Sequence, residues 1–207
     1  VFHDWLNLMV YAMQRRDPDY LKTIRRYPND REPGQREADY FSHALGALMI
    51  ALNSDVQDYL GLLYEEHIST GQLSQIFTPQ SLSQMISAIA LEPQESPFTV
   101  CDPACGSGRL LIEAVKQGPV KTACGIDLDD RCAKMTALNL LFMNVNAVVV
   151  CGNTLTDELR SAFEITHTPT GGLIREAPSA MYPERKSQPY LNRVFAIRPS
   201  LWGPIRD

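Results

Sequence analysis

The chain has 207 residues, of which 44% are hydrophobic and 21% are charged, and its formal net charge is −5. This composition excludes a disordered chain and a globally basic nucleic-acid binder. The length suits one substantial domain, or one domain with a small helical annex. A contact with DNA would need a local basic patch, for which Arg15-Arg16 and Arg25-Arg26 are the candidates. A solvated helix face is the favoured interpretation of both pairs.

The cysteines indicate a reduced compartment and no metal. The chain has five of them, and no pair has C-x-x-C spacing, so we expect no zinc site. An odd number of cysteines in apolar segments predicts buried thiols in a cytoplasmic protein. No apolar run is long enough to cross a bilayer and no signal peptide opens the chain, so we expect no membrane partner.

The first part of the chain is predicted to be an N-terminal helical region, residues 1–70. Apolar residues at helical spacing predict a helix over Phe2–Arg16, which Asp17-Pro18 is expected to end. Two further helices are expected over Glu37–Leu52 and from Ser54, a plausible N-cap, to His67.

Strands and helices alternate from residue 71 onward, which predicts right-handed βαβ units in an α/β domain over residues 71–207. The helices are expected over Ser81–Ala90, Arg109–Lys116 and Asp130–Met143. The strands are expected over Phe98–Cys101, Val120–Ile126, Ala147–Cys151, Leu159–Thr166 and Asn192–Ile197. The remaining tail is too short for a seven-stranded sheet, so we expect a mostly parallel, abbreviated one.

The run Asp102-Pro103-Ala104-Cys105-Gly106-Ser107-Gly108 lies where a predicted strand turns into a helix. Small residues let the backbone approach a ligand there, and the free N–H groups of the helix N-terminus favour an anion such as a carboxylate. The run lacks the third glycine of the dinucleotide fingerprint and the lysine of a P-loop. It therefore predicts a ligand-binding loop of a different kind.

An acidic residue, Asp127, follows the next predicted strand, about twenty residues further on. A carboxylate at such a strand end can accept hydrogen bonds from both hydroxyls of a ribose. A turn capped by aspartate is the alternative explanation. The order of strand, glycine loop, helix, strand and acid favours a cofactor that contains a nucleoside.

These motifs resemble the N6-adenine DNA methylase family, which includes the type I restriction-modification methylase subunits. The D-P-A-C-G-S-G run is similar to the family's first motif. Three more segments match in order over about residues 55–172, namely Asp58–Glu65, Gly71-Gln72 with Phe77-Thr78-Pro79, and Val150–Leu155. Compact methylase-like proteins of plasmids and conjugative elements are similar as well, which suggests by analogy a role in a mobile element.

The resemblance implies a Rossmann-like methyltransferase fold that binds S-adenosylmethionine (SAM) or S-adenosylhomocysteine. Phe77 and Thr78 would contact the methionine end, and Asp127 would hold the ribose. Asn153 matches a position where the family usually has an aspartate that binds the adenine amino group. The loop would be lined by Asp102, Ala104 and Gly106.

The family's catalytic motif, [Asn/Asp]-Pro-Pro-[Tyr/Phe], corresponds here to His167-Thr168-Pro169-Thr170. In the family the first residue accepts hydrogen bonds from the target amino group and the aromatic residue stacks on the flipped base. His167 and Pro169 are thus the candidate catalytic residues of a degenerate motif. Loss of the aromatic removes stacking worth roughly 1–3 kcal/mol per base.

Three functions remain open on this sequence. The first is a SAM-dependent adenine-N6 DNA methyltransferase with an unusual catalytic loop. The second is a SAM-binding pseudo-methylase that acts as a regulatory or interaction module, and the third is a methyltransferase for a substrate other than DNA. No helix-turn-helix or long basic segment is evident, so DNA specificity would come from a separate specificity or partner subunit.

Overall fold

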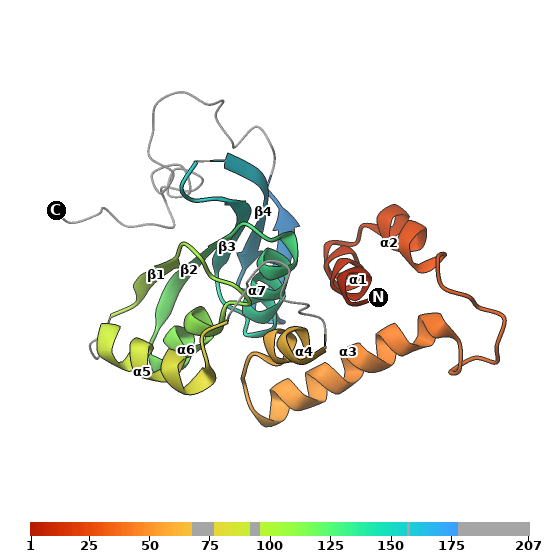
Figure 1. The fold of residues 1–207 in the computed structure, drawn as a ribbon, viewed down its shortest axis with the longest axis horizontal. Helices are drawn as coiled ribbons and strands as arrows, with labels where there is room; N and C mark the ends of the chain where they lie inside the picture. The colour runs from red at the N-terminus through yellow and green to blue at the C-terminus, as the bar shows by residue number, and fades with distance from the viewer. Residues whose placement is uncertain (68–76, 92–95, 157, 178–207) are drawn as a thin grey trace.

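The structure is a computed structural model that describes residues 1–67, 77–91, 96–156 and 158–177. In these residues it is an α/β protein with seven helices and a five-stranded mixed sheet (Figure 1). The helices that precede the first strand are α1 (Phe2–Gln14), α2 (Asp17–Ile24), α3 (Glu37–Ser54), α4 (Tyr59–His67) and α5 (Gln80–Ala90).

The first helices confirm the helical periodicity but correct two of the expected boundaries. Arg15 ends α1 in the left-handed conformation, at φ 56°. α1 ends at Gln14, before the expected Arg16, and Asp17-Pro18 begins α2, because proline is well tolerated in the first turn of a helix. Ser54 is the last residue of α3 and is not the N-cap of the next helix, since α4 begins at Tyr59.

The sheet has the order β1-β2-β3-β4-β5, with β1 at one margin of the described strands. β1, β2 and β3 pair in parallel, whereas the β3–β4 and β4–β5 pairs are antiparallel. The described sheet is therefore mixed, with β4 running opposite to the other four strands. The strands are β1 (Phe98–Asp102), β2 (Val120–Asp127), β3 (Ala147–Asn153), β4 (Glu158–Thr166) and β5 (Leu173–Glu176).

Two helices, α6 (Arg109–Gln117) and α7 (Asp130–Phe142), connect the parallel strands. α7 buries nine of its thirteen residues because it lies between the sheet on one side and α1 and α4 on the other (Figure 1). One hydrophobic core accordingly joins Leu6 of α1, Leu60 of α4, Leu138 of α7 and Ile174 of β5. The helical segment and the sheet thus share a core.

Parts of two expectations lie outside the described residues, namely the domain boundary at residue 70 and the strand over Asn192–Ile197. β5, in contrast, is a strand that the sequence pattern did not predict. No helix of the described segments is long and apolar enough to cross a membrane.

Candidate cofactor site

Three polar residues end the three parallel strands at the same edge of the sheet. Asp102 is the last residue of β1, Asp127 of β2 and Asn153 of β3. The strand register keeps these ends together, since Asp102 stands opposite Gly125 and Asp127 stands opposite Cys151. Ligands of open α/β sheets bind in the crevice outside such carboxyl ends. The candidate site therefore lies at this edge.

The glycine loop between β1 and α6 has a backbone that requires glycine at two positions. Gly106 has φ 55° and Gly108 has φ 87°, both in the left-handed region. A Cβ atom on Gly106 would also lie 3.0 Å from the ring of Phe77, which packs over the loop. The Thr136 hydroxyl donates to the Gly106 carbonyl at 2.9 Å and fixes the loop on α7.

Asp127 holds the glycine loop directly. Its Oδ2 accepts a hydrogen bond from the Gly106 N–H at 2.8 Å, and its Oδ1 accepts one from the Asp129 N–H at 2.8 Å. Each carboxylate oxygen has capacity for a second hydrogen bond, so both can still accept from a ligand hydroxyl. Burial raises the pKa of Asp127, and burial likewise raises the pKa of Asp102. Additional hydrogen-bond donors, such as those of a bound ligand, would favour the ionised forms of Asp127 and Asp102.

Five of the seven predicted cofactor-binding residues line one small cavity on this edge. Its volume is 60 Å³, which accommodates only one end of a cofactor. Asp127 adjoins the cavity through its hydrogen bond to Gly106. The cavity is lined by Phe77, Thr78, Asp102, Ala104, Cys105, Gly106, Ser107, Arg109 and Leu110.

Asn153 lies at the same edge but does not line this cavity. The hydroxyl of the next residue, Thr154, donates to the Pro103 carbonyl of the loop at 2.7 Å. The Asn153 side-chain oxygen accepts hydrogen bonds from the N–H groups of Leu155, at 2.9 Å, and Thr156, at 3.3 Å. The side-chain NH₂ is thus the part left for a ligand, and it suits a ring nitrogen better than an amino group.

The residues of the degenerate motif lie at the opposite end of the sheet. β4 runs antiparallel to β3, and Ser161 stands level with Asp127 across β3. His167 comes six residues further along β4, about 20 Å away at 3.4 Å per residue. Its N–H donates to Asn146 Oδ1 at 2.8 Å, in the turn that leads into β3. His167 and Pro169 therefore lie at the end of the sheet opposite the glycine loop.

A buried polar network that sequence reasoning missed supports the loop from behind. Its centre is Asp58, which has no exposed surface and precedes α4. Asp58 accepts hydrogen bonds from the Ser107 hydroxyl, from the Gly61 N–H at 2.9 Å and from Asn139 Nδ2 at 3.0 Å. Arg109 Nε adds an ion pair at 3.1 Å. Burial raises the pKa of Asp58, which these donors and the guanidinium oppose.

Arg109 extends this network to the segment over the loop. Its guanidinium donates to the Thr78 carbonyl at 2.7 Å and to the Glu65 carboxylate at 2.8 Å. Only 4% of Arg109 is exposed, whereas the Glu65 side chain is 34% exposed, so the Arg109 end of these bonds is shielded from water. Both acids belong to the D-Y-L-G-L-L-Y-E string, Asp58–Glu65, which was the available sequence signal.

The described residues contain no cluster of three or more His, Cys, Asp or Glu side chains that could hold a metal ion. The five cysteines are free thiols, and four of them are buried. Burial raises the pKa of the Cys105 thiol in the loop well above its ordinary value. Such a thiol packs as a small apolar group.

An α/β sheet with a glycine loop and a strand-end acid is an arrangement found in α/β proteins that bind nucleoside cofactors. Residues 55–169 match the family model described as N-6 DNA Methylase. The chain belongs to this N-6 DNA methylase family. It is 27% identical over 110 residues to the type I restriction enzyme MpnII methylase subunit of Mycoplasma pneumoniae, a match that covers 49% of this chain and 20% of that protein. The chain thus spans about a fifth of that relative. No solved structure matches.

Proposed function

We propose that this chain binds SAM at the carboxyl ends of β1–β3 and is the cofactor-binding part of a DNA-adenine methyltransferase of Rossmann-like type. The observation that carries the proposal is the hydrogen bond from the Gly106 N–H to Asp127, which joins the glycine loop to the strand-end acid. Family membership supports it, because it favours a SAM-dependent protein that modifies DNA.

The residues present fit the cofactor. Bound SAM supplies a methyl group on a sulfonium centre. Asp127 keeps acceptor capacity for the ribose hydroxyls, and the N-terminal end of α6 favours the carboxylate of the methionine part. Phe77 and Thr78 would enclose that part, since both line the cavity with Asp102. Asn153 would donate from its NH₂ group to a ring nitrogen of the adenine.

We further propose that the groups that hold the target adenine lie outside the described residues. The position of His167 carries this step, because it is separated from the loop by the length of β4. The relative is named a methylase subunit, which favours a partner subunit that supplies base binding and DNA specificity. The position of His167 also favours a second candidate, a cytoplasmic SAM-binding module that transfers no methyl group by itself.

Calorimetry with SAM and S-adenosylhomocysteine tests the cofactor proposal. The Asp127→Ala variant should bind at least about tenfold more weakly, because a charged acceptor contributes roughly 1.5–3 kcal/mol. Asp130→Ala is the matched control, since Asp130 pairs with Lys134 on α7. Unchanged affinity in Asp127→Ala, with unfolding curves that show an intact fold, would exclude the site.

The two candidate functions are separated by tritiated SAM and unmethylated genomic DNA. The cofactor-binding part of a methyltransferase should transfer label to adenine once a partner subunit is added. A module without transfer should bind SAM but leave the adenines of the DNA unlabelled, both with and without the partner subunit.

A further inference from the structure

Two cysteines stand opposite each other on neighbouring strands of the sheet. Cys101 of β1 pairs in register with Cys124 of β2, so both side chains extend from the same face of the sheet. On that face they pack in one apolar cluster with Ile126 and Val148. The other three cysteines belong to the separate hydrophobic core that α1 and α7 share. Cys101 and Cys124 therefore form a pair that is set apart from the remaining thiols.

The register gives this pair a separation that a disulfide can span. Neighbouring strands lie about 4.8 Å apart, and disulfides join Cα atoms that are about 4.4–6.8 Å apart. The two thiols already contact each other, because a hydrogen bond joins their side chains. A bond between the two sulfur atoms therefore requires rotation of the side chains and no movement of the strands.

The two thiols differ in exposure and in acidity. Cys101 is partly exposed and is the one cysteine of the five that is not buried, whereas Cys124 has no exposed surface. The hydrogen bond from Cys124 holds the pKa of the Cys101 thiol below its ordinary value, although burial and the Asp102 carboxylate oppose it. The same hydrogen bond, together with burial, raises the pKa of Cys124 well above its ordinary value.

A partly exposed thiolate that is backed by a buried thiol suits thiol–disulfide exchange. The thiolate is the attacking nucleophile, and the second thiol resolves the mixed disulfide that forms. The thiols of the other core do not suit this role, because burial raises the pKa of Cys132 and of Cys151 and keeps both protonated.

We propose that Cys101 and Cys124 form a redox-active dithiol that exchanges with small organic disulfides. The Cys101 thiolate attacks one sulfur of the disulfide R–S–S–R. A bond forms to that sulfur, the S–S bond of the reagent breaks, and one R–S⁻ leaves and takes up the proton that Cys101 lost.

The second step closes the disulfide within the protein. The Cys124 sulfur gives up its proton and attacks the Cys101 sulfur, and the second R–S⁻ leaves and takes up that proton. The protein dithiol is oxidised by two electrons, and R–S–S–R is reduced to two R–SH molecules. The inference does not rest on the proposed function, because neither thiol lines the cofactor cavity and the test uses no SAM.

The test begins with the unaltered 207-residue chain, reduced and then incubated with glutathione disulfide near neutral pH. Free thiols are blocked and the sulfur bonds are located by peptide mass mapping. A Cys101–Cys124 disulfide should form, and excess reduced glutathione should reopen it. Cys124→Ala should stop at one glutathionyl group on Cys101, and Cys101→Ala should form neither product. Cys132→Ala, which removes a buried thiol of α7, should behave as the unaltered chain does.

A second measurement separates an activated thiol from one that is merely exposed. Alkylation of Cys101 by iodoacetamide is followed across a pH series, and its midpoint reports the pKa of this thiol. Cys124→Ala should move the midpoint to higher pH and slow alkylation near neutral pH several-fold, because the hydrogen bond to the thiolate is lost.

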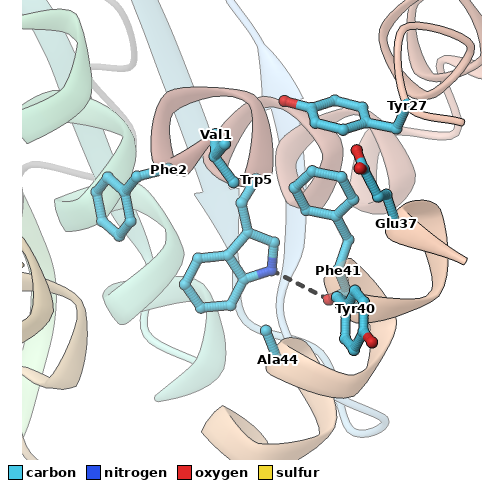
Figure 2. A pocket seen from close by; sticks show the side chains of 8 residues that line it. All are labelled: Val1, Phe2, Trp5, Tyr27, Glu37, Tyr40, Phe41 and Ala44. Atoms are coloured by element: carbon cyan, nitrogen blue, oxygen red, sulfur yellow. Dashed lines mark hydrogen bonds between the residues drawn. The ribbon is translucent and has the colours of Figure 1, made fainter. Parts of the chain in front are cut away.

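The fluorescence of Trp5, in a Trp202→Phe background, shows whether each variant is folded. Its indole Nε1 donates to the Phe41 carbonyl at 3.2 Å, beside a cavity between α1 and α3 (Figure 2). Absence of a disulfide in the unaltered chain, or a disulfide between a different pair of cysteines, would overturn the proposal. An unchanged alkylation midpoint in a folded Cys124→Ala variant would overturn it as well.

Discussion

The hydroxyl of Ser107 donates a hydrogen bond to the carboxylate of Asp58, which lies 49 positions earlier in the chain. Ser107 belongs to the glycine loop, and Asp58 is the fully buried residue before α4. Arg109 completes the link, because it binds both Asp58 and the Thr78 carbonyl. The loop and the segment above it are therefore held from the helical side of the molecule.

Removal of this link should destabilise the whole fold. Asp58→Ala should lower the free energy of unfolding by about 3–5 kcal/mol, since it leaves Arg109 buried with one partner fewer. Ser107→Ala should cost about 1–3 kcal/mol. The double variant should lose less than the sum, measured by urea unfolding. Ser42→Ala, in the exposed part of α3, serves as the control, and strictly additive losses would contradict the coupling.

Two helical glycines should respond in opposite ways to alanine. A Cβ atom at Gly61 would collide with the side chains of Asp58 and Ser107. Gly61→Ala should therefore lower the free energy of unfolding by about 3 kcal/mol. Gly46 lies within α3 with no atom near its Cβ position, so Gly46→Ala should stabilise by about 0.5–1 kcal/mol. Thermal unfolding measures both, and a neutral Gly61→Ala would show that the network can move.

The affinity for SAM should depend on the charge of Asp127. Burial raises the pKa of Asp127, so this carboxylate takes up a proton at a higher pH than an exposed aspartate does. Affinity should fall as the pH is lowered from about 7 towards about 4, because a protonated carboxyl accepts more weakly. The free energy of unfolding should depend on pH in the opposite direction. Because the pKa of Asp127 is raised in the folded state, protonation of this group favours the folded state, and its contribution to stability is lost as the pH rises.

Calorimetry across the pH series checks this expectation. Asp127→Asn should remove most of the pH dependence of binding, and Asp130→Asn should leave it in place. An Asp127→Asn variant that kept the full pH dependence would assign it to another group, for which Asp102 is the nearest candidate.

Restoration of the family's catalytic residues in the degenerate motif should create no activity. The combined variant His167→Asn, Thr168→Pro, Thr170→Phe alters the end of the sheet opposite the cofactor loop. It should also destabilise the fold, because the Thr168 hydroxyl donates to the Gly171 carbonyl and its N–H donates to Asn144. Transfer of tritiated methyl to DNA is the measurement, and activity gained only by this variant would contradict the observed position of β4.

The glycine loop and Asp127 could be predicted from the sequence because the residues that indicate them are close together in the chain. A buried strand, a run of small residues and a helix follow one another directly, and Asp127 ends the next strand. The carboxyl ends of parallel strands meet at one edge, so sequence order alone brings Asp102 and Asp127 together.

The hairpin of β3 and β4 was missed although the sequence contains its signal. Only four residues separate Asn153 from Glu158, and a parallel crossover needs a dozen or more. The Asp58 network was harder to predict for a different reason: Asp58 lies 49 positions from Ser107 and 51 from Arg109, and the Asp58–Glu65 string alone does not say which residues it contacts.

β1 is bordered by β2 on one side and by none of the described strands on the other, whereas β2 and β3 each lie between two strands. Peptide groups of an edge strand exchange their amide hydrogens through small local openings, while interior strands exchange only when larger units unfold. The glycine loop follows β1, which has one neighbour among the described strands, and Asp127 ends β2, which has two. The bond between Gly106 and Asp127 thus joins the loop after β1 to the end of β2. A ligand that contacts both the glycine loop and Asp127 will slow amide exchange along β1 and leave that of β3 unchanged.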